Sequence, residues 1–413
     1  MAAAKNKIVS VTGIVYFSLL MLAFSVPLYK KIVPYFIALF FLSWCAYMIV
    51  ERKHIHVEFK IPRLFSVLLY LTIAVSLLYT TNIKAGFFDL EVKLSLLFFP
   101  LIMSFSGDVI AERKRFDNVL SAFVAGTFAI TIICLAIAFY RCFTIFFTLD
   151  FFTYTYLASF HHPTYFAMFL NLAVAVLIYR IIERWHDIKP VIKAGMFLLV
   201  FYFVVFILLL NSKAGILALF LNIMGIIFYY TLIRKKVYVF LVLLTVLVTC
   251  SFLVIRLVPF VYQRFEEMKT SIKNYNTISL TTENDSEQRI LIWRYSSEII
   301  GDTWATGVGA GDVTSSLNKV YLEHGFIHGE EKNLNCHNQF LQTFVSTGIA
   351  GFLFLILLLA SLLIIALKNR NVILFSFFII ITSTMLSESI LETQAGTVFF
   401  GFFLSFLVNF RRE

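Results

Sequence analysis

Charged residues are scarce in this chain, and their scarcity excludes a soluble globular domain of the same length. Of the 413 residues, 14% are Asp, Glu, Lys or Arg, 60% are hydrophobic, and the mean hydropathy is +0.88. Apolar runs long enough to cross a bilayer as helices, about 20 residues each, recur along the sequence. Because these runs are continuous rather than alternating, they predict membrane-spanning helices and exclude a barrel.

Cysteine is also sparse, and its five positions form no disulfide framework. Four of them lie in or at the edge of apolar runs and are expected to be small buried hydrophobic residues: Cys45, Cys134, Cys142 and Cys250. The fifth, Cys336, lies in a long polar stretch.

Metal-binding and nucleotide-binding motifs are missing. No CxxC or HExxH is present, and glycines interrupt the one stretch in which potential ligands gather, namely His324, His328, Cys336 and His337. The segment 307–312, Gly-Val-Gly-Ala-Gly-Asp, lacks the GK[ST] ending of a phosphate-binding loop. We therefore expect no metal, no cofactor and no nucleotide-driven transport.

The apolar runs predict an all-α polytopic membrane protein with about twelve transmembrane helices. The first run lacks a small-residue cleavage site and is expected to be retained as a span rather than removed as a signal peptide. The predicted spans are 8–28, 32–50, 63–80, 89–106, 118–140, 163–182, 194–211, 214–232, 236–256, 340–367, 372–389 and 394–409.

The placement of positive charge predicts the orientation. Most Lys and Arg residues fall in one alternate set of loops, which includes the runs 113–115 and 234–236. The opposite short loops hold only Lys30, Lys31, Lys84, Arg141 and Lys213. Positive residues gather on the cytoplasmic side, so both termini are predicted to be cytoplasmic. This pattern also explains the net charge of +10 without a nucleic-acid partner.

A single long loop then lies outside the cytoplasm. It separates residues 1–256, with nine spans, from residues 340–413, with three, and the loop itself covers 257–339. Its beginning, 256–273, mixes charged and apolar residues and could lie along the membrane surface. Asp and Ser ahead of an apolar stretch predict a helix over about 285–300, and Gly307, Gly309 and Gly311 predict that the helical pattern ends there.

Polar residues gather where this loop enters the tenth span. His337, Asn338 and Gln339 are consecutive at a predicted membrane face, where polar side chains are costly if they touch lipid. A histidine there could accept a proton from a hydroxyl group. Alternatively, the segment is a cap for the first turn of the span, with Asn338 as the N-cap residue. Spacing alone does not separate the two interpretations.

Two cationic positions could bind phosphate. On a helix, Arg289 and Trp293 share a face, so the guanidinium could hold a phosphate while the indole lies against lipid or sugar. An interfacial helix with snorkelling side chains is the structural alternative. Lys213 follows a polar break between two spans and could be a fixed charge near a polyanion, or merely part of a tight turn.

Further candidates lie at the same predicted membrane face. His161 and His162 precede Tyr165 at the start of the sixth span and suit hydroxyl or phosphate binding, although such residues are common at membrane interfaces. Glu388, with Glu392, flanks the last extracytoplasmic turn. Glu388 could orient a histidine or bind sugar hydroxyls, or could be a solvated loop charge.

Taken in order, these segments resemble the O-antigen ligase (Wzy_C) superfamily over about residues 160–355. The segments that carry the resemblance are His162–Ala167, Ser212–Gly215, Arg289–Trp293, Gly307–Gly311, His337–Gln342 and Thr347–Gly351. Many family members have Arg where this chain has Lys213. Lysine keeps the positive charge but lacks the bidentate fork of arginine.

The resemblance implies a metal-independent, GT-C-like glycosyltransferase in the bacterial inner membrane, with one large periplasmic loop subdomain between spans nine and ten. It implies a glycan donor on undecaprenyl diphosphate, a lipid A–core hydroxyl as acceptor, and inversion at the anomeric carbon. Under the resemblance, His337 is the expected general base, and Arg289 and Lys213 the expected diphosphate ligands. His161, His162, Tyr165, Trp293, Asn338, Gln339 and Glu388 are expected to contact substrate.

Three other functions share features with this interpretation. A Wzy-like polymerase would use another lipid-linked repeat unit as the acceptor, and a protein O-oligosaccharyltransferase would use Ser or Thr. A non-catalytic flippase would need polar residues inside many spans, whereas the predicted spans are mostly Leu, Ile, Phe and Val, with polarity at their outer ends. We therefore expect surface chemistry rather than a conduit.

Overall fold

The computed structural model describes residues 11–50, 57–106, 109, 112–233, 237–273, 275 and 277–410. The regular structure of these residues is helical. The helices are α1 (Val11–Ser25), α2 (Val33–Val50), α3 (Ile61–Ser76), α4 (Ile83–Lys93), α5 (Ser95–Ser104), α6 (Arg113–Thr144), η3 (Leu149–Phe152), α7 (Tyr154–Leu157), α8 (Pro163–Glu183), α9 (Pro190–Leu209), α10 (Lys213–Ile233), α11 (Val237–Leu257), α12 (Pro259–Lys273), α13 (Asp285–Thr303), α14 (Val313–Glu323), α15 (Ile327–Glu331), α16 (Gln339–Lys368), α17 (Val372–Met385), η4 (Ile390–Glu392) and α18 (Gln394–Leu407).

Long apolar helices dominate the described residues, as expected for a polytopic membrane protein. By length and composition, α2, α6, α8, α9, α10 and α16 could each cross a membrane. The pair α11–α12, bent by 103°, could form one further span. Four shorter apolar helices, α1, α3, α17 and α18, complete the set. With one exception, each predicted span overlaps one helix of the structure. The number of membrane crossings stays a prediction.

The fourth predicted span, 89–106, is wrong as a single helix. The chain forms two helices there, α4 and α5, which meet at Leu94. The side chain of Asn82 caps α4 by accepting a hydrogen bond from the backbone N–H of Ala85 at 3.1 Å. Helix α4 carries four charged residues, Lys84, Asp89, Glu91 and Lys93, and charges are costly in a membrane span. The predicted helix at 285–300, in contrast, is confirmed as α13.

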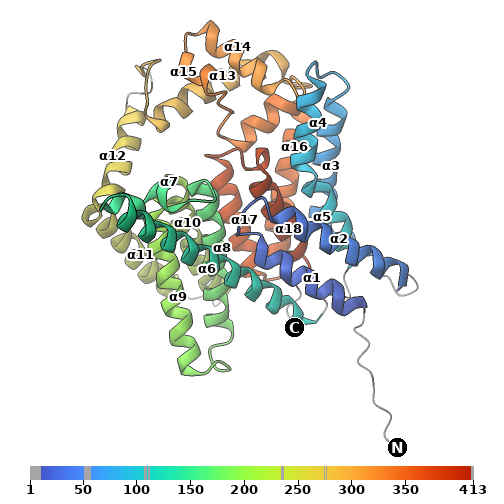
Figure 1. The fold of residues 1–413 in the computed structure, drawn as a ribbon, viewed down its shortest axis with the longest axis vertical. Helices are drawn as coiled ribbons and strands as arrows, with labels where there is room; N and C mark the ends of the chain where they lie inside the picture. The colour runs from blue at the N-terminus through green and yellow to red at the C-terminus, as the bar shows by residue number, and fades with distance from the viewer. Residues whose placement is uncertain are drawn as a thin grey trace, which may run out of the picture.

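The helices of the long loop gather at one end of the molecule (Figure 1). In that view α13, α14 and α15 lie at the top, α12 rises toward them from α11, and α16 descends from them. They share a small core in which Leu291, Tyr295, Leu317 and Tyr321 are buried. The loop therefore forms a helical subdomain with its own apolar interior.

The main core lies around α8, α17 and α18. These helices are buried along almost their entire length, as expected for helices that are apolar on every side. Phenylalanine rings fill the space between neighbours: Phe169 of α8 lies 5.1 Å from Phe399 of α18, centroid to centroid. Both the N-terminal end of α8 and the loop between α17 and α18 contribute side chains to this core.

The glycine-rich segment after α13 fills a break in α16. At Gly348 the φ angle is +63°, so the helix is interrupted there. The freed carbonyl oxygens of Val345 and Ser346 accept hydrogen bonds from the N–H groups of Val308 and Gly309, at 2.8 and 3.0 Å. A broken helix in a membrane protein needs such partners for its backbone. The segment 307–309 supplies them.

The same glycine-rich segment also contacts the corner between α3 and α4. Its last residue, Asp312, accepts hydrogen bonds from the backbone N–H groups of Thr81 and Asn82, at 2.6 and 2.9 Å. Gly311 donates its N–H to the hydroxyl of Thr80 at 3.2 Å. The segment 307–312 therefore joins the subdomain to α4 and to α16, and its N–H groups contact protein rather than forming a phosphate cradle.

We expect Gly311→Ala to destabilise the protein. An added Cβ at Gly311 would lie 2.1 Å from the carbonyl oxygen of Asn82, which is backbone and cannot move aside easily. Overpacking of this kind costs about 1–3 kcal/mol. The matched control is Gly301→Ala, where an added Cβ meets nothing within 4 Å. Thermal unfolding in detergent should show a lower Tm for Gly311→Ala alone, and equal Tm values would contradict the docking role.

Candidate functional site

A buried carboxylate in the loop between α17 and α18 contacts two of the predicted site residues. Glu388 Oε1 accepts a hydrogen bond from Arg289 Nη2 at 2.7 Å. Its second oxygen, Oε2, lies 3.4 Å from Nδ1 of His337. The Glu388 side chain is only 7% exposed, so it is not a solvated loop charge. Arg289 also donates through Nη1 to the carbonyl oxygen of Ser387.

Arg289 is positioned by the first turns of α13. The side chain of Asn284 caps the helix by accepting a hydrogen bond from Ser286 N–H at 2.9 Å. Asp285 and Glu287 lie in the first turn, where negative side chains stabilise a helix by interacting with the positive end of its dipole. Leu291 and Ile292 are buried in the subdomain core. This burial fixes the rotation of α13 and places Arg289 against the loop after α17.

His337 is positioned by a sharp change in backbone direction. Its neighbour Cys336 is fully buried in the subdomain core, and Asn338 caps α16 by accepting hydrogen bonds from Phe340 and Leu341 N–H at 2.9 and 3.2 Å. Between them, His337 has a φ of +42°, a left-handed conformation that is uncommon outside glycine. The cap proposed as an alternative for this segment is therefore present, and it coexists with a histidine directed at Glu388.

The contact with Glu388 favours one tautomer of His337. A carboxylate at 3.4 Å accepts the proton on Nδ1, which leaves the lone pair of Nε2 as the acceptor. In the described part of the chain, Nε2 of His337 makes no hydrogen bond. The side chain remains partly exposed, at 27%. An imidazole oriented in this way can accept a proton from a hydroxyl group.

Lys213 reaches the same face of α13. Its ammonium donates to Ser286 Oγ at 2.8 Å and forms an ion pair with Glu267 of α12 at 3.1 Å. Ser286 lies three residues before Arg289, so both side chains project from one side of the helix. If Arg289 and Lys213 bind an anion, the anion must either share the Lys213 ammonium with Glu267 or displace Glu267 from it.

The segments around Lys213 and His162 pack against each other. Ser212 and Thr164 hydroxyls lie 3.0 Å apart. Gly215 lets α8 and α10 approach closely, because an added Cβ would lie 2.4 Å from Cβ of Ala167. The two segments are therefore packed together, and Lys213 connects them to α13.

His162 and Tyr165 face the site, whereas His161 does not. Glu388, Arg289 and His337 all act electrostatically on His162, an exposed residue whose pKa is lowered chiefly by desolvation. Tyr165 is buried and hydrogen-bonds Thr393. His161 instead directs Nε2 at the carbonyl oxygens of Pro27 and Leu28. The structure thus brings His162 and Tyr165 toward Glu388 and places His161 on the connection between α1 and α2.

The remaining candidates have structural partners. Gln339 is buried, and its side chain bonds Leu391 N–H and the Thr343 hydroxyl. Trp293 packs partly buried against the subdomain core, and its indole N–H has no hydrogen-bond partner among the residues that the structure describes. The substrate contacts predicted for Gln339, Trp293 and Asn338 stay predictions.

The potential zinc ligands of the long loop have separate partners. His324 lies 2.9 Å from Glu298 and stacks on Tyr295, while Cys336 accepts a hydrogen bond from Ser296 at 3.3 Å. Burial raises the pKa of the Cys336 thiol to about 12. Over the described residues, no group of three or more His, Cys, Asp or Glu side chains could hold a metal ion.

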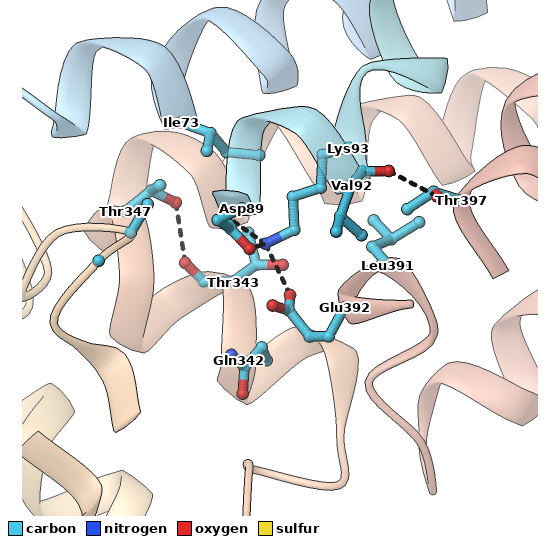
Figure 2. A network of polar contacts seen from close by, with 12 residues as sticks. Ile73, Asp89, Val92, Lys93, Gln342, Thr343, Thr347, Leu391, Glu392 and Thr397 are labelled. Carbon is cyan, nitrogen blue, oxygen red and sulfur yellow. Dashed lines mark hydrogen bonds and ion pairs between the residues drawn. The ribbon is translucent and has the colours of Figure 1, made fainter. Parts of the chain in front are cut away.

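Lys93 was missed by the sequence reasoning, although it belongs to a buried network beside the site (Figure 2). Its ammonium lies 2.7 Å from Asp89 and 2.8 Å from Glu392. The signal was available, since Asp89 and Lys93 are four residues apart in an apolar run and charges there are rare without a role.

The charges around Glu388 determine its protonation. Burial alone would raise the pKa of its carboxyl group. The hydrogen bond with His337 and the positive charge of Arg289 outweigh burial and lower the pKa to about 2. Glu388 is therefore ionised at neutral pH and supplies negative charge to both partners.

Fold and site together define a polytopic helical membrane protein with a basic, histidine-containing site at one end of its helices. Residues 197–356 match the Wzy_C family model, which is described as O-antigen ligase. The match confirms the predicted resemblance, although it begins later than residue 160 and covers less than half of the chain. It includes Lys213, Arg289 and His337 and leaves Glu388 outside. A search of curated proteins found no match.

We expect acid to weaken the protein through Glu388. A carboxyl whose folded pKa is about 2, below the ordinary value of 4.5, contributes stability above the ordinary value. That contribution, on the order of 3 kcal/mol at most, is lost as the pH falls from about 4.5 to 2. The change Glu388→Gln should remove this part of the acid dependence when Tm is measured against pH.

The matched control is Glu298→Gln, which removes an exposed carboxyl of α13. It should keep the acid dependence of the wild type. Parallel curves for the wild type and Glu388→Gln would contradict an ionised, paired Glu388.

Proposed function

We propose that this protein is an O-antigen ligase-type glycosyltransferase, which moves a glycan from undecaprenyl diphosphate to a hydroxyl of lipid A–core oligosaccharide. The observation that carries the proposal is the shared contact of Arg289 and His337 with Glu388, with Lys213 on the same side of α13. The family match adds weight, since it points to an O-antigen ligase or a related polymerase. The site would face the periplasm of a bacterial inner membrane, with both termini cytoplasmic.

The chemistry requires a proton acceptor. A sugar hydroxyl is a weak nucleophile, and it gains strength when a base removes its proton during attack. His337 is suited to this step, because Glu388 holds Nδ1 and Nε2 remains the acceptor. The hydroxyl oxygen forms its bond to the anomeric carbon from the side opposite the diphosphate, so the configuration inverts.

The chemistry also requires cations. As the bond between the anomeric carbon and the diphosphate oxygen breaks, negative charge grows on the leaving group, and fixed positive charge stabilises it. The described residues take only some of the N–H donors of Arg289. The others could bind phosphate oxygens, with Lys213 as a second charge. His162 and Tyr165 lie near Glu388 and Arg289 and would contact sugar or phosphate.

The acceptor distinguishes this function from its nearest rival, a Wzy-like polymerase. Deletion of the gene should leave bare lipid A–core and accumulate long polymer on undecaprenyl diphosphate. A plasmid with His324→Ala should restore the polymer on lipid A–core, and one with His337→Ala should not, because loss of a general base lowers the rate about 10²–10⁴-fold. Glycolipids are separated by gel electrophoresis in each strain.

Other outcomes would replace the proposal. Lipid A–core capped by one repeat unit in the deletion strain would indicate a polymerase. Unchanged glycolipids with unglycosylated periplasmic proteins would indicate a protein O-oligosaccharyltransferase. Full complementation by His337→Ala would remove the general-base role.

Arg289 gives a separate prediction for donor binding. In purified enzyme in nanodiscs, Arg289→Ala should weaken undecaprenyl diphosphate binding about ten- to a hundredfold, as expected for lost charge-assisted hydrogen bonds. Arg289→Lys should recover part of the affinity, since it keeps the charge but not the fork. The control is Arg294→Ala, on the same helix but bonded to Tyr275. Equal affinities for all variants would exclude Arg289 as a diphosphate ligand.

A further inference from the structure

The loop that carries Glu388 is held on one side by the beginning of α16. Asn338 donates its side-chain N–H to the carbonyl oxygen of Leu386 at 3.1 Å and its backbone N–H to Ser389 Oγ at 3.2 Å. Leu391 donates its N–H to Gln339 Oε1 at 2.7 Å. The residues next to His337 therefore bind the loop before and after Glu388.

The opposite side of the loop is held by an ion pair from α4. Figure 2 shows the ammonium of Lys93 between the carboxylates of Asp89 and Glu392, at 2.7 and 2.8 Å. The Lys93 side chain is 4% exposed and that of Glu392 is 15% exposed. A second contact lies nearby, since the hydroxyl of Thr397 bonds the carbonyl oxygen of Val92 at 2.8 Å.

A buried group of this kind is a poor source of stability. Removing three ionisable groups from water is costly, and apolar residues of similar size are often as stable or more stable. What an ion pair adds is a fixed geometry, because the charges hold their partners in one arrangement. A fixed geometry matters where the position of a side chain must be exact, and Glu388 is such a side chain.

The helix that carries Lys93 is anchored at its other end as well. The residues just before α4, Thr81 and Asn82, donate backbone N–H groups to Asp312. Asp312 ends the glycine-rich segment that fills the break in α16. Helix α4 therefore links the subdomain that carries Arg289 to the loop that carries Glu388.

We propose that Lys93 is a positioning residue, which holds the 386–392 loop through Glu392 and so keeps Glu388 in register with His337 and Arg289. The inference rests on the proposed function for its effect on catalysis. Its structural claim is that the contacts of Glu388 depend on Lys93. This claim holds whether or not the proposed function is correct. Lys93 itself need not touch substrate.

The test is a double-mutant cycle between Lys93→Met and Glu388→Gln on the purified enzyme. Lys93→Met should lower kcat about ten- to a hundredfold, the effect of a small misplacement, with the donor KM within about twofold of the wild type. If Lys93 acts through Glu388, the double variant should be no slower than Glu388→Gln alone. Multiplicative effects would overturn the proposal.

Two further variants guard against a folding defect. Lys93→Arg keeps the charge and should retain most of kcat. Glu392→Gln removes one charge of the ion pair but keeps an oxygen atom beside the Lys93 ammonium, and it should give an intermediate value. If Lys93→Met does not fold, the cycle is run with Glu392→Gln instead. Equal losses of kcat in Lys93→Arg and Lys93→Met would contradict an ion-pair role.

A measurement of Tm against pH, which requires no enzymatic activity, separates this proposal from the proposed function. Lys93→Met should flatten the acid dependence of Tm that Glu388 causes, because a displaced Glu388 loses its pairing. A flattened curve in a protein that transfers no glycan would support the positioning role and reject the transferase. An unchanged curve would reject the positioning role, whatever the activity.

Discussion

The arrangement of the site depends on one buried negative charge. An ionised carboxylate away from water must be paired, and Glu388 meets this need with Arg289 of α13 and His337 before α16, residues 99 and 51 positions away in sequence. Without that charge, Arg289 and His337 would lose the partner that they share. The pairing also prepares each partner for chemistry. Glu388 orients the imidazole of His337, and it holds the guanidinium of Arg289, whose other N–H donors can bind an anion.

A second constraint is the interrupted helix α16. A helix broken at Gly348 exposes carbonyl groups that need donors, and the glycine-rich segment after α13 provides N–H groups at hydrogen-bonding distance. The segment 307–312 and the break at Gly348, which are far apart in sequence, therefore form one hydrogen-bonded junction. This junction attaches the subdomain to the membrane helices, and through Asp312 it also fixes the beginning of α4.

Much of this could be predicted from the sequence, because apolar runs and capping residues are local signals. The long helices, α13 and the cap at Asn338 follow from them. The break at Leu94 and the Lys93–Glu392 pair could not be found in this way, since they depend on which distant segments meet. The same holds for His161 and His162, which are neighbours in sequence and identical in type. Only the packing of α8 decides which of them faces Glu388.

The most direct test is a cryo-EM structure of the protein in lipid nanodiscs with undecaprenyl diphosphate. We expect density for the diphosphate between Arg289 and Lys213, with Nε2 of His337 facing the position of the first sugar. Glu388 should still contact Arg289 and His337. Diphosphate bound elsewhere, or a His337 turned away from it, would contradict the account.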